Sequence, residues 1–460
     1  MENDSKERFM RAAIELAKKG EGWTNPNPLV GAVIVKENQI IGQGYHHKYG
    51  DLHAERDALR DCRERGNDPS GAQIFVTLEP CCHTGKQPPC VEALVQTGIK
   101  KVVVGSRDPN PLVSGKGAAF LRERGVEVEE DFLRSECDAL NFIFFHYITN
   151  KTPYVALKYA MTADGKIATA AGKSKWISCQ ESRDFVHQLR AKYSCIMAGI
   201  GTVLADDPLL TCRIPGGRTP TRIICDSSLR IPLDSKIVQT AADVPTIVAC
   251  AEPDSGDRMQ DQDCAAPSAE RTQDLNAGAN GEASQDQDCA AGENRSQDQN
   301  GAALPDRDFL EKEKALAKKG VQVIRCGSPS CGNRVDLCLL MKKLGELNLD
   351  SVLVEGGGAL NFSLLKAGLV QRVYSFVAPK IFGGAAAPSP VGGQGVLEVA
   401  DAFSLSQSDA RKIGSDVLIE YEVVGGKNCG ATQGQKAAGS LGEPGSFSES
   451  RNPGAKCSQE

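Results

Sequence analysis

Two short stretches, far apart in the sequence, carry residue types that would bind a metal ion if they met in space. The stretch "LHAE" (52–55) supplies a histidine, and "TLEPCCHTGKQPPC" (77–90) supplies three cysteines. The imidazole of His53 with the thiolates of Cys81 and Cys90 would give three protein ligands. Three ligands suit a catalytic zinc ion, which keeps its fourth position open for water. Each stretch leads into an expected helix, where the helix dipole favours a thiolate over a thiol.

Glu55 gives this pattern a chemical meaning. It follows His53 by two residues, is not needed as a ligand, and could carry a proton from zinc-bound water to a leaving amine. A structural zinc site, the alternative, usually takes four protein ligands and has no use for such a glutamate. The order H-x-E…P-C…C is the signature of zinc-dependent base deaminases. Those enzymes commonly have C-x-x-C, whereas eight residues separate Cys81 from Cys90 here, and Cys82 is expected to be a bystander.

Helix and strand signals alternate through the first part of the chain, from about residue 5 to 148. The runs "PLVGAVIV" and "AQIFVTLE" read as strands, and "HAERDALRDC" places apolar residues on one helical face. This alternation indicates a layered α/β domain. A second α/β domain is expected to begin at 149 and to end near 424, followed by a disordered tail at 425–460.

The second domain is interrupted by a polar segment at about 251–305. It is rich in Gln, Asp, Ala, Gly, Ser and Asn, and "QDQDCAA" occurs in it twice. Such a segment cannot bury enough apolar surface to offset the entropy of ordering it. We interpret it as a disordered insertion. A linker between separate domains is the weaker alternative, because similar strand signals flank the segment on both sides.

Charge and hydropathy exclude several classes of function. A formal net charge of −6 provides no broad basic field for nucleic acid. The charged start "MENDSKERFMRAA" does not read as a signal peptide, and "LNFIFFHYI" is too short to cross a bilayer. Most of the seventeen cysteines are expected to be buried and inert in a long chain of this kind. We therefore expect a cytoplasmic protein with no nucleic-acid or membrane partner.

Longer motifs give the chain a specific resemblance. "NPNPLVGAVIV", "GYHHKYGDLHAE", "TLEPCCHTGKQPPC" and "DPNPLVSGKG" together resemble the deaminase half of the RibD family of bifunctional riboflavin biosynthesis proteins. "TPYVALKYAMTADGKIAT", "WIS", "GIGTVLADDPLLTCR" and "VEGGGALNFSLL" resemble its reductase half. The resemblance covers nearly all of 5–424 apart from the insertion. It implies a cytidine-deaminase-like three-layer α/β/α domain followed by a dihydrofolate-reductase-like α/β domain.

The resemblance also implies two reactions on small phosphorylated pyrimidines. The first is zinc-dependent hydrolytic deamination of 2,5-diamino-6-(5-phosphoribosylamino)pyrimidin-4-one, with one zinc ion per chain. The second is NADPH-dependent reduction of the ribosyl group to a ribityl chain. The zinc ligands and the proton carrier are the residues named above. Three more residues match positions that contact the deaminase substrate: Asn27, His46 and Lys86.

In the reductase half, "VLVEGGGALNFSLL" runs from a strand through three glycines into a helix, an arrangement that can cradle a phosphate. The absence of G-x-G-x-x-G after the first strand argues against a Rossmann domain. By resemblance, the substrate-contacting residues are Lys158, Ser174, Arg190, Leu210, Arg213 and Glu355. The corresponding NADPH-contacting residues are Ala160, Trp176, Thr202, Asp206, Gly357, Gly358, Ala359, Leu360, Asn361, Phe362 and Ser363.

Three rival interpretations fit the sequence less well. A nucleic-acid or nucleoside deaminase with an unrelated C-terminal domain is disfavoured by the acidic net charge, the long cysteine spacing and Lys86. A zinc-stabilised binding protein is disfavoured by Glu55. A reductase with a dead deaminase half is disfavoured by the complete set of zinc ligands. We further expect a homo-oligomer, whose size the sequence does not fix.

Overall fold

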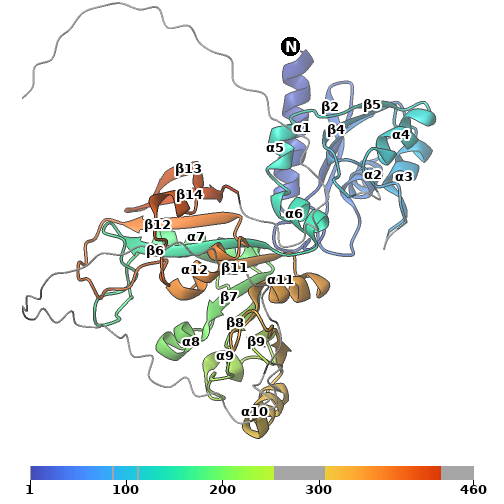
Figure 1. Cartoon of the computed structure of the whole chain (residues 1–460). Helices are drawn as coiled ribbons and strands as arrows, with labels where there is room; N and C mark the ends of the chain where they lie inside the picture. The colour runs from blue at the N-terminus through green and yellow to red at the C-terminus, as the bar shows by residue number, and fades with distance from the viewer. Residues whose placement is uncertain (1, 85–86, 111–112, 253–305, 426–460) are drawn as a thin grey trace, which may run out of the picture.

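The computed structural model describes residues 2–84, 87–110, 113–252 and 306–425. They form two α/β domains that contact each other (Figure 1). The first domain is built on a five-stranded sheet in the order β2-β1-β3-β4-β5, in which β1 is antiparallel to its neighbours and β3, β4 and β5 are parallel. The strands are β1 (Gly31–Lys36), β2 (Gln39–Tyr45), β3 (Gln73–Leu78), β4 (Lys101–Ser106) and β5 (Glu127–Glu129).

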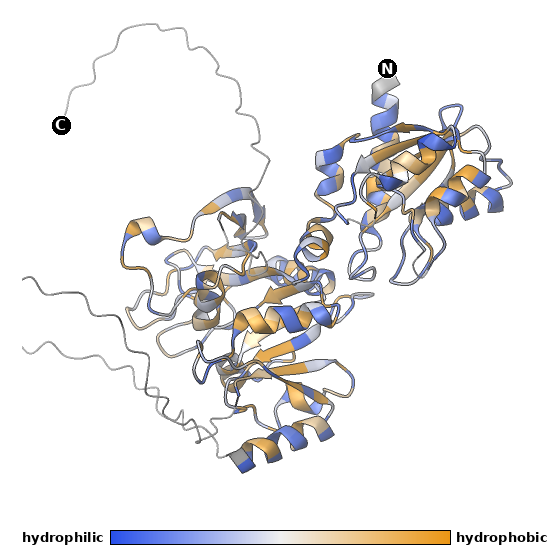
Figure 2. Cartoon of the chain, turned by 45° about the vertical axis from the view of Figure 1, so that its right-hand side comes forward, coloured by the Kyte–Doolittle hydropathy of each residue, from blue (hydrophilic) through white to orange (hydrophobic). Residues whose placement is uncertain are grey.

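Helices cover both faces of this sheet. They are α1 (Glu2–Lys18), α2 (Ala54–Glu64), α3 (Cys90–Gln96), α4 (Lys116–Glu123) and α5 (Arg134–Asp138). Successive residues of a strand point to opposite faces, so Val33 packs with Phe9 of α1, whereas Ile34 packs with Leu59 of α2. The two separate cores confirm the predicted three-layer architecture. Figure 2 shows the apolar strands enclosed by helices that carry polar residues on their outer sides.

The second domain has a nine-stranded sheet in the order β10-β9-β8-β7-β11-β6-β12-β14-β13. All neighbouring strands are parallel except at β14, which is antiparallel to both β12 and β13. The strands are β6 (Tyr154–Thr162), β7 (Cys195–Gly199), β8 (Thr221–Cys225), β9 (Thr246–Cys250), β10 (Val321–Arg325), β11 (Ser351–Val354), β12 (Arg372–Ala378), β13 (Leu405–Ile413) and β14 (Asp416–Val423).

This sheet also separates two layers of helices. The helices are α7 (Gln180–Lys192), α8 (Ile200–Asp206), α9 (Lys236–Gln239), α10 (Asp306–Lys318), α11 (Leu337–Glu346), α12 (Gly358–Lys366) and a short 3-10 helix (Val399–Asp401). Met197 packs with Leu340 of α11 on one face, and Ile196 packs with Val203 of α8 on the other. Because both faces are covered, the central strands read as continuous apolar runs.

The polar segment interrupts one sheet. Strand β9 precedes it and β10 follows it, and the two strands are parallel neighbours. Disorder was predicted for 251–305 and 425–460. Apart from 251–252 and 425, these residues lie outside the described ones.

The apolar run "LNFIFFHYI" forms most of α6 (Phe142–Asn150), which lies at the junction of the two domains (Figure 1) and contributes side chains to the cores of both. Ile143 packs with Tyr154 of the second domain, whereas Phe144 packs in the core of the first. The expected boundary at 148/149 therefore falls inside a helix. No helix among the described residues has the length and apolarity needed to cross a membrane.

Polar contacts also join the domains. Asn25 Nδ2 donates to Asp350 Oδ2 at 2.7 Å, and Lys192 forms a 2.8 Å ion pair with Glu21. Asp350 immediately precedes β11, a central strand of the second sheet. The junction thus connects the segment that leads into β1 with the middle of the second sheet.

Candidate active sites

The three predicted zinc ligands converge, although each comes from a different element. His53 is the N-cap of α2, Cys90 is the first residue of α3, and Cys81 lies in the loop after β3. His53 Nδ1 lies 3.5 Å from Cys81 Sγ and 3.4 Å from Cys90 Sγ. Among the described residues, these three form the one cluster of histidine, cysteine and acidic side chains found to suit a metal ion.

The spacing of these atoms fits zinc. A tetrahedral ion with bonds of about 2.3 Å to sulfur and about 2.0 Å to nitrogen separates those donors by about 3.5 Å. The two observed nitrogen–sulfur distances agree with this value. One imidazole and two thiols are also the donor set that zinc prefers. Cys82 is absent from the cluster because its side chain packs against the core beneath β3.

The surroundings of Cys81 favour its thiolate form over the thiol. A hydrogen bond from the Cys90 thiol and the interaction with His53 lower the pKa of Cys81 to about 4. The backbone N–H of Cys90 also donates to this sulfur at 3.4 Å. The N-terminus of α3 therefore stabilises negative charge where the sequence predicted that it would.

Glu55 lies in the first turn of α2, two residues from His53, and is only 3% exposed. Burial, reinforced by the negative charge of Cys81, raises the pKa of Glu55. A carboxyl group with a raised pKa can hold and release a proton near neutral pH, as acid–base catalysis requires.

A cavity of about 350 Å³ lies over this cluster. Its lining includes the expected residues Asn27, His46, His53, Glu55 and Cys81, while Cys90 is fully buried and does not reach the lining. Lys86, the predicted phosphate contact, lies outside the described residues.

Asn27 and His46 form a hydrogen-bonded pair in the cavity wall. His46 Nδ1 lies 2.9 Å from the carbonyl oxygen of Leu52, so Nδ1 carries the proton and Nε2 accepts from Asn27 Nδ2 at 3.2 Å. Burial lowers the pKa of His46, which favours this neutral form. The carbonyl oxygen of the Asn27 amide is then available to accept a hydrogen bond from a ligand.

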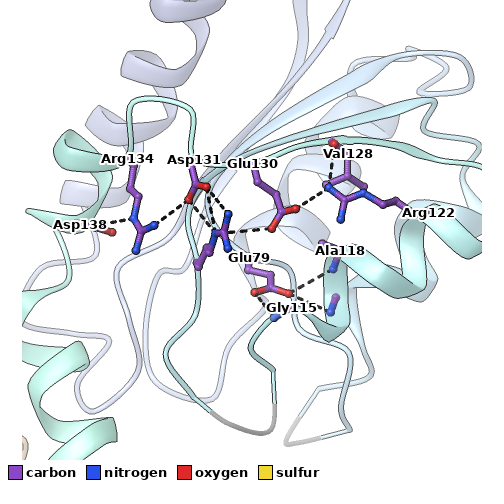
Figure 3. Close-up of polar contacts among 11 residues, drawn as sticks. Glu79, Gly115, Ala118, Arg122, Val128, Glu130, Asp131, Arg134 and Asp138 are labelled. Atoms are coloured by element: carbon purple, nitrogen blue, oxygen red, sulfur yellow. Dashed lines mark hydrogen bonds and ion pairs between the residues drawn. The ribbon is translucent and has the colours of Figure 1, made fainter. Parts of the chain in front are cut away.

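Glu79 fixes the loop that carries Cys81. Its carboxylate accepts hydrogen bonds from the backbone N–H groups of Gly115 and Gly117, both at 3.0 Å, and of Ala118 at 3.3 Å (Figure 3). A carboxylate at a helix N-terminus satisfies donors that have no partner inside the helix. Glu79 thereby ties the end of β3 to α4 and is a structural residue.

Among the cavity residues that sequence reasoning missed are Asp108, Asn110, Tyr147 and Asn348. Asp108 and Asn110 belong to "DPNPLVSGKG", a motif that was recognised but not assigned a role. Burial raises the pKa of Asp108 to about 6. Asn348 comes from the second domain, and no local sequence signal connects it with this cavity.

A larger cavity, of about 910 Å³, lies in the second domain at the carboxyl ends of β6, β7, β8 and β11. Of the predicted substrate contacts, it is lined by Lys158, Ser174, Arg190, Arg213 and Glu355. Of the predicted NADPH contacts, it is lined by Ala160, Trp176, Thr202, Asp206, Gly357, Gly358, Ala359, Leu360, Asn361 and Ser363. Leu210 and Phe362 are absent from the lining. Leu210 packs in the core beside α8, and Phe362 packs against Gly393.

An ion-pair network lies inside this cavity. Arg190 Nε and Nη2 donate to the two oxygens of Glu355 at 2.5 and 2.9 Å, and Lys158 Nζ donates to Glu355 at 3.5 Å. Burial alone would raise the pKa of Glu355, but the charges of Arg190 and Lys158 lower it to about 2. Arg190 Nη1 donates to the carbonyl of Thr211, so three of its five N–H groups are occupied within the protein.

The glycine run after β11 has the geometry of a phosphate cradle. Gly356 and Gly357 have φ angles of 152° and 81°, which side chains rarely adopt. A Cβ on Gly358 would lie 2.9 Å from the carbonyl oxygen of Ser389, so the backbone there is in close contact. The first N–H groups of α12 have no partner within the helix and can bind an anion.

Both halves of the chain match known protein families. Residues 3–106 match the family model for the cytidine and deoxycytidylate deaminase zinc-binding region, and residues 153–270 and 302–419 match that for the RibD C-terminal domain. The riboflavin biosynthesis protein RibD of Actinobacillus pleuropneumoniae is 46% identical over 416 residues, which cover 90% of this chain and 95% of that protein. The chain belongs to the RibD family. RibD of Escherichia coli (strain K12) is 32% identical, with 90% and 98% covered.

Solved structures of the RibD family share this architecture. One is the diaminohydroxyphosphoribosylaminopyrimidine deaminase/5-amino-6-(5-phosphoribosylamino)uracil reductase of Thermotoga maritima, with 34% identity and a TM-score of 0.71, covering 92% of this chain and 100% of that one. Another is RibD of Acinetobacter baumannii, with 31% identity and a TM-score of 0.71, covering 92% and 99%. Membership of the RibD family, with the zinc-binding deaminase region and the reductase domain, makes zinc and NADPH the cofactors of this chain.

Proposed function

We propose that the two cavities are the successive active sites of a bifunctional enzyme of riboflavin biosynthesis. The first would deaminate the diaminohydroxyphosphoribosylaminopyrimidine, and the second would reduce the resulting 5-amino-6-(5-phosphoribosylamino)uracil, as the name of the Thermotoga maritima relative describes. The observation that supports this most strongly is the convergence of His53, Cys81 and Cys90 beside the buried Glu55, on a chain that also carries a reductase domain.

In the deaminase cavity, we assign the zinc ion to His53, Cys81 and Cys90. Zinc, when bound, supplies a Lewis acid that activates a water molecule. Glu55 accepts the proton of that water and delivers it to the departing amine, so ammonia leaves and a carbonyl group remains on the ring. Asn27, held by His46, accepts a hydrogen bond from the ring and orients it. Lys86 is proposed to meet the substrate phosphate.

In the reductase cavity, we assign the substrate to Lys158, Ser174, Arg190, Arg213 and Glu355, and we leave out Leu210, which packs in the core. NADPH, when bound, supplies a hydride to the ribosyl carbon. Ala160, Trp176, Thr202, Asp206 and the run from Gly357 to Ser363 are proposed to hold it, with the phosphates at the start of α12. Because Glu355 and Thr211 together occupy three of the five N–H groups of Arg190, we propose that Arg213 contributes the freer guanidinium to the substrate phosphate.

The domain division is also a proposal: a deaminase domain at 1–148, a reductase domain at 149–424 with an insertion at about 251–305, and a tail at 425–460. It is supported by the parallel pairing of β9 with β10 across the insertion. We propose a cytoplasmic location, with no nucleic-acid or membrane partner. None of the thirteen cysteines among the described residues forms a disulfide, as in a reducing compartment.

We also propose that the protein is a homo-oligomer. Ile381, Leu397 and Val399 are 78%, 95% and 92% exposed, although side chains of this kind are normally covered. They lie in the segment between β12 and β13. A second copy of the chain is the partner that we propose for this surface, and equilibrium sedimentation of the purified protein tests it.

A coupled assay tests the proposed function. The full chain is supplied with the diaminopyrimidine substrate and NADPH, and ammonia release and NADPH oxidation are followed separately. The wild type should perform both reactions. Glu55→Gln should release no ammonia but still oxidise NADPH with the deaminated substrate. Loss of both activities in this variant would contradict the assignment of two separate sites, and ammonia release that persists would contradict the role of Glu55.

A further inference from the structure

One residue in the rim of the deaminase cavity belongs to the reductase domain. Asn348 lies two residues beyond the end of α11, with a φ of 59°, and its N–H donates to the carbonyl of Gly345 at 2.9 Å. This is the C′ position of a helix, where a left-handed residue is usually glycine or asparagine. The turn therefore explains the backbone of Asn348, but it leaves the presence of its side chain in the cavity wall unexplained.

The side chain is held from the deaminase side. Tyr147 of α6, itself part of the cavity wall, lies with its hydroxyl 3.1 Å from the carbonyl oxygen of Gly345 and 3.3 Å from Asn348 Oδ1. A hydroxyl has one hydrogen to donate, so the two acceptors share it. This contact occupies the amide oxygen of Asn348. Within the part of the chain that the structure describes, no partner is found for its Nδ2 group, which remains available to a ligand.

The position of this turn is fixed by close packing across the domain junction. A Cβ on Gly345 would lie 2.1 Å from the carbonyl oxygen of Lys151, just beyond α6, so the two backbones are in direct contact. Two residues after Asn348, Asp350 accepts the 2.7 Å hydrogen bond from Asn25. The residues that follow Asn25, from 26 to 28, line the cavity as well. The 345–350 segment thus touches two walls of the deaminase cavity.

The substrate class gives this arrangement a role. Cys90 is fully buried beneath the cavity, so the pyrimidine ring must enter deeply for its amine-bearing carbon to reach the metal. The phosphoribosylamino substituent must then extend toward the rim. Asn348, Tyr49 and His83 are exposed residues of that rim. A neutral amide donor at this point matches ribose hydroxyl and phosphate oxygens.

We propose that Asn348 is a substrate-positioning residue of the deaminase, supplied by the reductase domain. It donates a hydrogen bond from Nδ2 to the phosphoribosyl part of the substrate, so the deaminase cavity is incomplete without the neighbouring domain. This inference rests on the proposed deaminase function and adds a residue that selects for a phosphoribosylated pyrimidine over the bare ring.

Two variants separate the side chain from the turn. Asn348→Gly keeps a residue that accepts the left-handed conformation and removes only the amide. Asn348→Asp keeps the shape but places a carboxylate near a phosphorylated substrate. Arg218→Ala is the matched junction control, because Arg218 Nη1 donates to the carbonyl of Gly22 at 3.1 Å, and Arg218 does not line the cavity.

The readouts are KM and kcat for ammonia release, NADPH oxidation on the deaminated substrate, and zinc content, all in the full chain. Asn348→Gly should raise the deaminase KM by about three- to tenfold, the effect of one neutral hydrogen bond, and change kcat by less than about twofold. Asn348→Asp should raise KM further, and removal of the substrate phosphate should reduce that excess. The reductase kinetics and zinc content should stay at wild-type values, and Arg218→Ala should leave the deaminase KM unchanged.

Other outcomes overturn the inference. An unchanged deaminase KM in both Asn348 variants would show that the side chain does not meet the substrate. An equal change in Arg218→Ala, or a parallel loss of both activities, would show that Asn348 acts only through the junction. Failure of the proposed function is distinguishable, since the wild-type protein would then release no ammonia.

Discussion

Arg190 donates two parallel hydrogen bonds to Glu355 inside the reductase cavity, from Nε at 2.5 Å and from Nη2 at 2.9 Å. The side chains are 13% and 7% exposed, so the pair is largely removed from water. Lys158 adds a second positive charge at 3.5 Å. A pair in this setting has a defined geometry, and its members are hard to replace singly.

Removing one charge of this network should therefore leave the remaining charges buried and uncompensated. Glu355→Gln leaves Arg190 and Lys158 buried without their counter-ion, and we expect it to lower the free energy of unfolding by about 3–5 kcal/mol. NADPH oxidation should be lost, whereas ammonia release should persist at a temperature where the variant is folded. Urea unfolding and the two separate activity assays check this. A variant as stable as the wild type would show that the pair contributes nothing to folding.

The same carboxylate predicts an acid-dependent stability difference. The pKa of Glu355 lies near 2 in the folded chain, below its ordinary value of 4.5. A carboxyl group whose pKa is lower in the folded than in the unfolded chain stabilises the fold when the pH is above the unfolded pKa. This stabilisation is lost as the pH falls toward the pKa of the folded state. Between about pH 5 and pH 3, wild-type stability should fall more steeply than that of Glu355→Gln, by roughly 2 kcal/mol. Urea unfolding midpoints measured across this pH range test the prediction. An equal dependence of stability on pH in both proteins would contradict it.

The adjacent cysteines offer a matched test of the metal site. Cys81→Ser removes a sulfur that lies 3.5 Å from His53 Nδ1, whereas Cys82→Ser changes a side chain that packs against the core. We expect the first variant to purify with less than about a tenth of the wild-type zinc and to release no ammonia, since structural integrity of the site needs all three donors. The second should keep both. Metal analysis by mass spectrometry would contradict the ligand assignment if the two variants lost zinc equally.

The glycine cradle can be tested against another glycine with a positive φ. Gly357 and Gly216 have φ angles of 81° and 70°, so alanine is strained at both positions. Only Gly357 lines the reductase cavity. Gly357→Ala should weaken NADPH binding by tenfold or more, while Gly216→Ala should bind NADPH as the wild type does. Fluorescence titration with NADPH measures both, and equal affinities in the two variants would remove Gly357 from the cofactor site.

Local sequence signals were enough to locate the zinc cluster. His53, Glu55, Cys81 and Cys90 lie at helix starts or strand ends whose positions follow from apolar periodicity, so their meeting could be predicted. The central strands were predicted for the same reason, since their apolar runs are continuous. Strand β13 was missed because it is exposed over most of its length and its sequence "LSQSDARKI" shows no apolar alternation.

Residues that depend on the meeting of two domains could not be predicted. Tyr147 belongs to an apolar run whose length excluded a membrane span but did not reveal which core it would join. Asn348 follows an ordinary helix end, and its relation to the deaminase cavity arises only from contacts with residues some 200 positions earlier. Leu210 was assigned through the family resemblance, and its side chain packs into the core away from the cavity lining.

The pairing of β6 has a consequence for the order in which the protein is made. β6 follows α6 directly, yet its partners β11 and β12 begin at Ser351 and Arg372. During synthesis the deaminase strands can pair long before those residues leave the ribosome. In contrast, β6 cannot pair with β11 until about 200 more residues have been synthesised. The zinc ligands are then all available early, but the rim residue Asn348 emerges just before β11. A nascent chain could therefore take up its metal well before its first active site was complete.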